Sequence, residues 1–244
     1  MRIALLGNVF QTKKNAYIKR VLKKLAELQA DICIEEGFAD FLNRELSVSL
    51  NGMDTFKMPH LKADLVISMG GDGTFLTSAA QVGARGIPIL GINTGRLGFL
   101  ADVSPEDIEN ALDAVFDGRY TIEQRAVIAM TLDGETYHGY PYALNEVAIL
   151  KHDNSSLIEI DTHINGALLT NYMSDGLIIS TPTGSTGYSL SVGGPIIVPR
   201  SGTFCLSPVA SHSLSTRPVI VCDDVVITPV SYTHLRAHET RRHL

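Results

Sequence analysis

Cysteine is scarce in this chain of 244 residues, and its few copies lie far apart. The three cysteines are Cys33, Cys205 and Cys222, and no Cys-x-x-Cys pair occurs. An odd number of widely spaced thiols favours reduced cysteines in a cytosol over a disulfide framework or a zinc site. Cys33 lies inside an apolar, strand-like run, which predicts a place in a hydrophobic core.

The chain also lacks a long apolar run and an excess of positive charge. No stretch approaches the ~18 apolar residues of a membrane span, and the N-terminus has no long apolar h-region. We therefore expect a soluble cytoplasmic protein with no membrane partner. The formal net charge of -6 argues against a nucleic-acid partner held by phosphate neutralisation. With 45% hydrophobic residues, the chain can form one large domain or two modest ones.

Two common phosphate-binding signatures are missing as well. Gly71-x-Gly73 is followed at the third-glycine position by Leu76, so the dinucleotide fingerprint Gly-x-Gly-x-x-Gly fails. No Gly-x-x-x-x-Gly-Lys-Ser/Thr string occurs anywhere in the sequence. These absences exclude an ordinary Rossmann dehydrogenase and a P-loop NTPase.

What is present is a glycine-rich loop with a carboxylate inside it, Gly70-Gly71-Asp72-Gly73-Thr74. The loop follows the apolar run 65–69, and residues 75–80 after it can open a helix. Glycines let backbone N–H groups approach phosphate oxygens, and a helix N-terminus favours anions. A carboxylate there would repel phosphate, so Asp72 needs another role, such as holding Mg²⁺ or accepting a proton from an attacking hydroxyl. Taken alone, the string fits a tight turn with a solvated Asp72 equally well.

Residues 1–120 alternate strand and helix patterns. Apolar runs at 2–6, 31–35, 65–69 and 87–92 predict buried strands, and apolar residues at helical spacing between 18 and 28 predict a helix. A second helix is expected at 74–84. Ser104 and Pro105 begin a third, and Gly118 follows it. The pattern predicts a doubly wound α/β domain, in which ligands bind beyond the carboxyl ends of the strands.

Residues 121–230 carry hairpin signals instead. Asp133-Gly134 and Asn165-Gly166 are favoured two-residue turns between strand-like segments. Further strands are expected at 146–150, 157–164, 177–180, 219–221 and 225–228. We therefore predict an α/β + β fold, a mainly antiparallel β domain following the α/β domain, with the active site in the cleft between them.

A second polar stretch runs from Asp175 to Pro195. Five Ser/Thr hydroxyls lie between residues 180 and 186 and offer uncharged donors for ribose or phosphate. Taken alone, the stretch favours a polar loop with a helix cap. Together with the distant Gly70–Thr74 loop, it favours a nucleotide site.

In its motifs the sequence closely resembles the NAD kinase family. The matching motifs are Gly-Gly-Asp-Gly-Thr at 70–74, Asn-Thr-Gly-Arg-Leu-Gly-Phe-Leu at 93–100, Asn145-Glu146, the 175–195 stretch and His-Ser-Leu-Ser-x-Arg-Pro at 212–218. They follow the family's order and spacing from near residue 1 to about residue 230. The Gly-Gly-Asp-Gly string alone would be shared with lipid kinases and phosphofructokinases, and the other motifs narrow the choice.

The resemblance implies ATP-dependent phosphorylation of the adenosine-ribose 2′-hydroxyl of NAD, giving NADP. ATP would be the phosphoryl donor with Mg²⁺ or another divalent metal, for which no direct protein ligand is assigned. NAD and ATP would be the partners, and the protein would be a homodimer or homotetramer. Phosphoryl transfer asks a protein mainly for positioning and charge neutralisation, so one carboxylate with backbone donors and Mg²⁺ would suffice.

The resemblance also carries roles to individual positions. Asp72 matches the family's proton acceptor, and Gly73 would present its backbone to the nucleotide. Asn145 and Glu146 would bind ribose hydroxyls, and Asp175 would accept from the nicotinamide amide, often across a subunit boundary. The remaining substrate-binding positions, which line the adenine and nicotinamide portions, are Thr186, Gly187, Tyr188, Ser189, Leu190, Ser191 and Ala210. Arg96 and His212 are candidate phosphate contacts, although an Arg beside glycines is also a common surface residue and a lone His is more often structural.

The chain departs from the family at three places. Gly187 stands where most relatives carry alanine, and Met173 where some carry arginine. After Val230 the family continues through further strand, whereas residues 231–244 look foreign to it. We expect this tail to be a fusion scar or assembly error, loosely attached, after a chain truncated near residue 230. Its His238-Glu239-x-x-x-His243 is one residue too long for the zinc-protease motif.

Two alternatives stay open at this stage. One is a lipid or sugar kinase that shares the Gly-Gly-Asp-Gly loop, although a lipid kinase needs an apolar trough and the second half offers polar loops. The other is a nucleotide-binding fragment without activity, because a missing C-terminal segment would leave the site incomplete.

Overall fold

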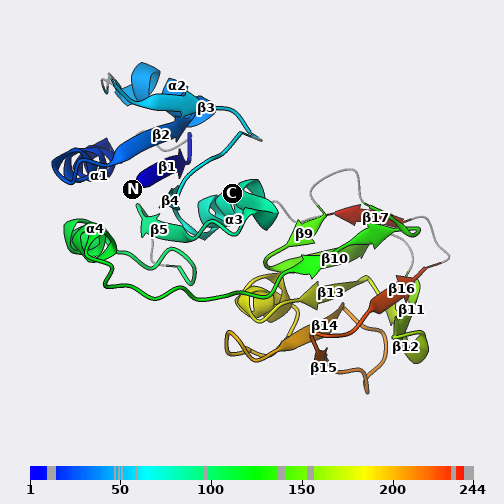
Figure 1. The fold of residues 1–244 in the computed structure, drawn as a ribbon. Helices are drawn as coiled ribbons and strands as arrows, with labels where there is room; N and C mark the ends of the chain where they lie inside the picture. Colours follow the sequence, from blue (N-terminus) through cyan, green and yellow to red (C-terminus); the bar gives the residue numbers. More distant parts are fainter. Residues whose placement is uncertain are drawn as a thin grey trace. The chain divides into compact units, whose positions relative to one another are not determined.

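The computed structural model divides the chain into two compact units, residues 1–123 and 124–244 (Figure 1). It describes residues 1–9, 15–46, 48, 50, 52–58, 60–95, 98–136, 141–152, 157–231 and 235–238. The predicted Arg96 and most of the predicted tail lie outside these residues.

The first unit is built on a five-stranded, wholly parallel sheet. Its strands are β1 (Arg2–Gly7), β2 (Asp31–Glu35), β3 (Asp54–Phe56), β4 (Leu65–Gly70) and β5 (Ile89–Asn93), in the order β3-β2-β1-β4-β5. Because the chain runs outward in opposite directions from β1 and β4, the strand order reverses between these two strands. Ligands of doubly wound folds bind at the carboxyl ends of strands at such a switch point. The Gly70–Thr74 loop begins at the carboxyl end of β4.

Helices cover both faces of this sheet. They are α1 (Asn15–Glu27), α2 (Glu36–Leu46), α3 (Asp72–Val82) and α4 (Ile108–Phe116), with the 3₁₀ turns η2 (Gly83–Arg85) and η3 (Pro105–Asp107). One core cluster joins α1, α2 and α4 to one face, and Ile18, Val21 and Leu25 supply the stripe of α1 at helical spacing. Val82 of α3 packs with residues of the opposite face.

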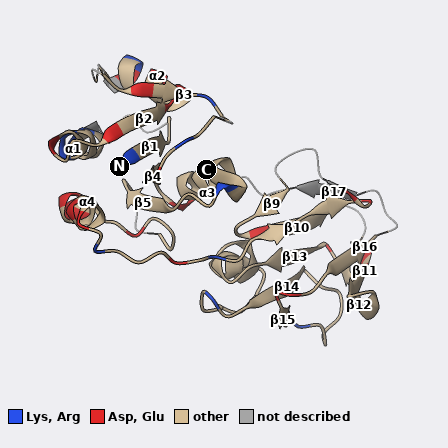
Figure 2. Ribbon diagram, in the orientation of Figure 1, with Lys and Arg blue, Asp and Glu red and all other residues tan. Residues whose placement is uncertain are grey.

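Ion pairs join α1 to α4 at their solvent edge. Arg20 donates to the carboxylate of Glu109, and Lys24 Nζ lies 2.7 Å from Asp113 Oδ1. The acidic residues of α4 are visible in Figure 2. The hydrogen bond from Arg20 holds the pKa of Glu109 below its ordinary value.

The second unit contains two packed antiparallel sheets. The larger has the order β15-β14-β13-β10-β17, formed by β10 (Glu146–Lys151), β13 (Gly176–Ser180), β14 (Thr203–Val209), β15 (Val219–Cys222) and β17 (Leu235–His238). The smaller, β12-β11-β16, is formed by β11 (Ile158–Ile164), β12 (Ala167–Ser174) and β16 (Ile227–Val230). A core cluster that includes Ile149, Ile160, Tyr172, Leu177 and Leu206 takes residues from both sheets.

Short elements complete the unit. Two further ladders pair β6 (Ile128–Ala129) with β9 (Tyr142–Ala143) and β7 (Thr131–Leu132) with β8 (Glu135–Thr136). The turn η4 (Thr183–Thr186) and the helix α5 (Tyr188–Ser191) follow β13. The two predicted hairpin turns are confirmed, because Asp133-Gly134 joins β7 to β8 and Asn165-Gly166 joins β11 to β12. All four turn residues have positive φ, as a type I′ turn requires.

The predicted tail contains a strand. Leu235–His238 pairs antiparallel with β10, with Leu235 opposite Lys151 and His238 opposite Ala148. The expectation of a loosely attached tail therefore differs from the structure at these four residues. An edge strand presents unpaired N–H and C=O groups, and any extended segment that reaches it can satisfy them regardless of its side-chain pattern. None of the helices in the described ranges is long and apolar enough to cross a membrane.

Tyr172 lies in the core of the second unit, and its hydroxyl is buried. Tyr172 is 1% exposed, and its hydroxyl has no hydrogen-bond partner among the described residues. Burial raises the pKa of this hydroxyl. Because an unpaired buried hydroxyl costs desolvation energy, Tyr172→Phe should keep or raise the free energy of unfolding, by up to about 1 kcal/mol in urea denaturation.

The matched control is Ile160→Val in the same cluster, which should lower the free energy of unfolding by about 0.5–1.5 kcal/mol. A loss of more than 1 kcal/mol in Tyr172→Phe would mean that the hydroxyl is satisfied in solution.

Candidate active site

The Asp72 carboxylate is fixed by where the helix begins. Asp72 is the first residue of α3, Gly71 caps the helix, and the N–H groups of Thr74 and Phe75 donate to the carbonyl of Gly71 at 3.0 Å. A Cβ at Gly70 would overlap the side chain of Thr74, so this position needs glycine. The helix N-terminus favours a negative charge at Asp72.

Three backbone N–H groups from a second loop hold this carboxylate. Phe99 N donates to Oδ2 at 2.8 Å, and Leu100 N and Ala101 N donate to Oδ1 at 3.0 and 3.2 Å. A Cβ at Gly98 would overlap the carboxylate, so glycine permits the close approach. The Asp72 side chain therefore joins the loop after β4 to the loop after β5.

The carboxylate retains capacity for another partner. Two carboxylate oxygens offer about four lone-pair positions, and the hydrogen bonds above use three. Oδ2 accepts only one of them, so this oxygen can accept a proton or contact a cation. The chemistry predicted for Asp72 is compatible with its surroundings.

The neighbouring loop after β5 is tied to the same edge. Thr94 N donates to the carbonyl of Gly70 at 3.2 Å, and Gly95 N donates to Asn93 Oδ1 at 2.6 Å. Gly73 is exposed, and nothing lies within 4 Å of a Cβ built on it. An incoming group can approach this backbone closely.

In the second unit, the loop after β13 packs directly on Asn145. Thr181 N donates to the Asn145 carbonyl at 2.9 Å, and the Thr181 hydroxyl donates to the carbonyl of Leu144 at 2.6 Å. A Cβ at Gly184 would overlap the Asn145 carbonyl. The contact therefore requires glycine and brings residues 181–187 against the Asn145-Glu146 pair.

Polar atoms gather at this contact. Glu146 is 7% exposed, and a Cβ at Gly187 would lie 2.9 Å from Glu146 Oε2 and 3.4 Å from Asn145 Nδ2. Asn145 Oδ1 is buried and has no hydrogen-bond partner among the described residues. A buried acceptor without a partner costs free energy, so it suits a ligand that donates to it.

Most hydroxyls predicted as ligand donors are used inside the loop. Ser185 donates to the carbonyl of Pro182 at 2.6 Å, and Thr186 donates to the carbonyl of Thr183 at 3.3 Å. Ser189 is fully buried, 3.1 Å from the Ser207 hydroxyl. These contacts build the loop. Of the remaining predicted positions on α5, Leu190 and Ser191 are exposed and Tyr188 is half-buried.

Asp175 lies in a different part of the second unit. Its N–H donates to the carbonyl of Val209 at 2.9 Å, and its carbonyl accepts from Lys151 N at 3.0 Å. Lys151 Nζ also lies 2.6 Å from Asp175 Oδ1. The predicted Ala210 follows directly and has φ of 46°, and His212 N donates to the carbonyl of Met173 at 3.0 Å.

The predicted residues of the second unit thus form two groups at opposite ends of one ladder. Glu146 pairs with Ser180 at one end of β10 and β13, and Leu150 pairs with Gly176 at the other. The five steps from Glu146 to Lys151 span about 17 Å at ~3.4 Å per residue. Asn145, Glu146 and Gly187 lie together, whereas Asp175, Ala210 and His212 lie at the far end.

Lys151 lies at the candidate site, although the sequence pattern does not indicate it. It is the charged residue at the end of an apolar strand, and nothing in its neighbours marks it. Its contact with Asp175 depends on the register between β10 and β13, which no local pattern gives.

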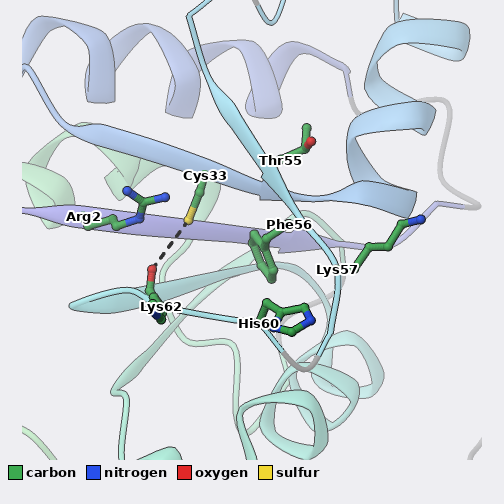
Figure 3. Close-up of a pocket in the computed structure, with 7 residues that line it drawn as sticks. All are labelled: Arg2, Cys33, Thr55, Phe56, Lys57, His60 and Lys62. Carbon is green, nitrogen blue, oxygen red and sulfur yellow. Dashed lines mark hydrogen bonds between the residues drawn. The ribbon is translucent and has the colours of Figure 1, made fainter.

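A separate cavity of about 510 Å³ lies in the first unit and contains none of the predicted site residues (Figure 3). It is lined by Arg2, Cys33, Thr55, Phe56, Lys57, His60 and Lys62. Arg2 pairs with Asp31 and Asp54, and Lys57 pairs with Glu36. Burial raises the pKa of the Cys33 thiol, which disfavours a reactive thiolate. The lining therefore gives no reason to place the chemistry here.

The close contact between Gly98 and the Asp72 carboxylate leaves no room for a side chain at residue 98. Gly98→Ala should displace the carboxylate, break hydrogen bonds from residues 99–101 and lower the free energy of unfolding by about 1–3 kcal/mol. Thermal unfolding measures the loss. Gly73→Ala is the matched control, because its Cβ meets open space within α3 and alanine favours a helix. Equal melting temperatures for the two variants would contradict the clamp on Asp72.

Comparisons with known proteins match both units. A family model described as the ATP-NAD kinase N-terminal domain matches residues 17–120, and one described as the ATP-NAD kinase C-terminal domain matches residues 144–238. An NAD kinase of Bacteroides fragilis is 54% identical over 228 residues, which cover 93% of this chain and 79% of the relative. An NAD kinase of Cytophaga hutchinsonii is 40% identical over 230 residues, with the same coverage of 93% and 79%.

Solved structures agree with these relatives. An NAD kinase from Archaeoglobus fulgidus in complex with ATP superposes with a TM-score of 0.72 at 26% identity, covering 95% of this chain and 81% of that one. Yeast NADH kinase complexed with NADH superposes with a TM-score of 0.81 over 93% of this chain and 71% of that one, and at 22% identity it shows the fold alone. The predicted order of a parallel α/β unit before an antiparallel β unit is confirmed. With its sequence and its fold in agreement, the chain belongs to the NAD kinase family.

Proposed function

We propose that this protein transfers the γ-phosphoryl group of ATP to the 2′-hydroxyl of the adenosine ribose of NAD, giving NADP. Membership of the NAD kinase family supports an ATP-dependent NAD kinase. The observation that carries the mechanism is the Asp72 carboxylate, set on a glycine-rich loop with one oxygen that accepts a single hydrogen bond. A lipid or sugar kinase is not favoured, because both units match NAD kinase models.

In this proposal Asp72 is the proton acceptor. The N–H groups of residues 99–101 hold its carboxylate in a fixed position. A general base must lie within hydrogen-bond reach of the proton that it removes. Oδ2 would accept the proton of the 2′-hydroxyl as the hydroxyl oxygen attacks the γ-phosphorus of ATP, and ADP would leave with the bridging oxygen. Gly73 would then present its open backbone to the phosphates.

NAD is held by the second unit in this proposal. Asn145 and Glu146 would bind the ribose hydroxyls, and the unpartnered Asn145 Oδ1 supports this because a ribose hydroxyl can donate to it. Thr186, Gly187 and Tyr188 would flank the adenosine with Leu190 and Ser191, whereas the fully buried Ser189 would support the loop from inside. The absence of a side chain at Gly187 leaves room beside Glu146.

Mg²⁺ would neutralise phosphate charge when it is bound with ATP. Mg²⁺ commonly binds through one or two carboxylates together with substrate phosphates. The remaining position on Asp72 Oδ2 is given to the 2′-hydroxyl proton in this proposal, so no direct protein ligand is assigned to the metal. Chelation by EDTA should abolish NADP formation and added Mg²⁺ should restore it; activity that persists in EDTA would exclude the metal.

We also propose a homodimer or homotetramer in the cytoplasm. Asp175 and Ala210 lie at the opposite end of the β10–β13 ladder from Glu146, and in this proposal they act toward the NAD of a neighbouring copy. The three free thiols support a reducing compartment. Sedimentation should give the mass of a dimer or tetramer, and a monomer at assay concentration would contradict the shared site. Cell fractionation tests the location.

The direct test of the function is NADP formation from NAD and ATP with Mg²⁺, measured together with calorimetric binding of NAD. Turnover with ATP supports the kinase. Binding without turnover would instead identify a nucleotide-binding fragment.

Asp72→Asn should lower kcat by about 10²- to 10⁴-fold, because general-base assistance is lost. Affinity for NAD should stay within a few-fold, since the groups proposed to hold it are unchanged. Steady-state kinetics and calorimetry separate the two effects. An unchanged kcat would remove Asp72 from the mechanism.

Asn145→Ala should weaken NAD binding by roughly 1–3 kcal/mol, because buried polar groups of the ligand lose a partner. Calorimetry with NAD and with ATP makes the comparison. Should ATP affinity fall while NAD affinity holds, Asn145 has been assigned to the wrong substrate.

A further inference from the structure

Lys151 and Asp175 contact each other through both backbone and side chains. Lys151 N donates to the Asp175 carbonyl at 3.0 Å, and Lys151 Nζ lies 2.6 Å from Asp175 Oδ1. The side chains are 22% and 34% exposed, so the ion pair is partly shielded from water. The contact places a positive charge directly beside the Asp175 carboxylate.

The pair is also held in place by its neighbours. Asp175 N donates to the Val209 carbonyl at 2.9 Å, and the Ser174 hydroxyl donates to the carbonyl of Gly176 at 2.8 Å. A Cβ at Gly176 would overlap the carbonyl of Ile149, so the turn lies tightly against β10. The backbone of Asp175 is therefore held beside that of Lys151.

The charge of this pair affects the relative affinity of the site for NAD⁺ and NADH. The nicotinamide ring is a cation in NAD⁺ and is neutral in NADH, whereas the carboxamide is present in both. A bare carboxylate beside the ring would attract NAD⁺ more strongly than NADH. A carboxylate paired with an ammonium group presents a dipole instead, and it can still accept from the carboxamide.

We propose that Lys151 is a specificity-determining residue that reduces discrimination between NAD⁺ and NADH by neutralising Asp175. The inference rests on the proposed function, in which Asp175 meets the nicotinamide. Lys151 acts through Asp175 and touches neither phosphate nor ribose in this scheme. Its removal should change which dinucleotide is preferred rather than whether phosphoryl transfer occurs.

The test compares kcat/KM for NAD⁺ and NADH in Lys151→Met, which keeps the length of the side chain and removes its charge. The ratio of NAD⁺ to NADH should rise by roughly three- to ten-fold, since the site is partly exposed and salt screens it. The gain should shrink between 0.05 and 0.5 M NaCl, values at which the screening length falls from about 14 to about 4 Å. A purely structural role for Lys151 would not give this salt dependence.

Three controls accompany this variant. Lys151→Arg keeps the charge and should keep the wild-type ratio. Lys24→Met removes a comparable lysine–aspartate pair, with Nζ 2.7 Å from Asp113 and the lysine 17% exposed, in the first unit. It should not change the ratio. In the Asp175→Asn background, Lys151→Met should have no further effect on the ratio, because the carboxylate that the lysine would otherwise neutralise is absent.

Each other outcome overturns the inference. Equal losses with both dinucleotides would assign Lys151 a structural role, and an increase that persists with Asp175→Asn would mean that Lys151 repels the ring directly. Wild-type protein that phosphorylates neither dinucleotide would overturn the proposed function together with this inference. Phosphorylation with an unchanged ratio in Lys151→Met would overturn the inference alone.

Discussion

The hydrogen bonds from residues 99–101 to the Asp72 carboxylate fix the position of the glycine-rich loop at residues 70–74. Asp72 begins α3, and the bonds join that helix to the loop after β5. The bond between Thr94 N and the Gly70 carbonyl adds a second link between the same loops. The carboxyl edge of the sheet is thereby organised around one side chain that is also the proposed base. A substitution at Asp72 consequently affects both the chemistry and the support of the loop.

The β10–β13 ladder plays a comparable part in the second unit. At one end it brings Asn145 and Glu146 against the loop that contains Gly184, and at the other it brings Lys151 to Asp175. Along these strands one face enters the core with Ile149, Leu177 and Ile179. Family motifs that are far apart in sequence therefore map to two distinct regions.

The sequence predicted much of this fold where local signals were strong. Apolar runs placed the main parallel strands, and Asp133-Gly134 and Asn165-Gly166 placed two hairpins. Helix α2 was missed, although Phe38, Phe41 and Leu42 have helical spacing, because it follows β2 without a break. Strand β14 was missed because small and polar residues and a proline interrupt its apolar pattern. The bonds to Asp72 and the Lys151–Asp175 pair depend on tertiary approach and register, for which a single sequence has no local signal.

The pairing of Glu146 with Ser180 and of Leu150 with Gly176 gives the two polar groups a common alignment. A slip of one residue would turn every side chain of β10 to the opposite face. Ile149 would leave the core, Asn145 would lose its place under Gly184, and Lys151 would separate from Asp175 in the same step. One strand register therefore sets the alignment of both polar groups. A variant that kept one group aligned and misaligned the other would have to break the β10–β13 hydrogen bonds between them.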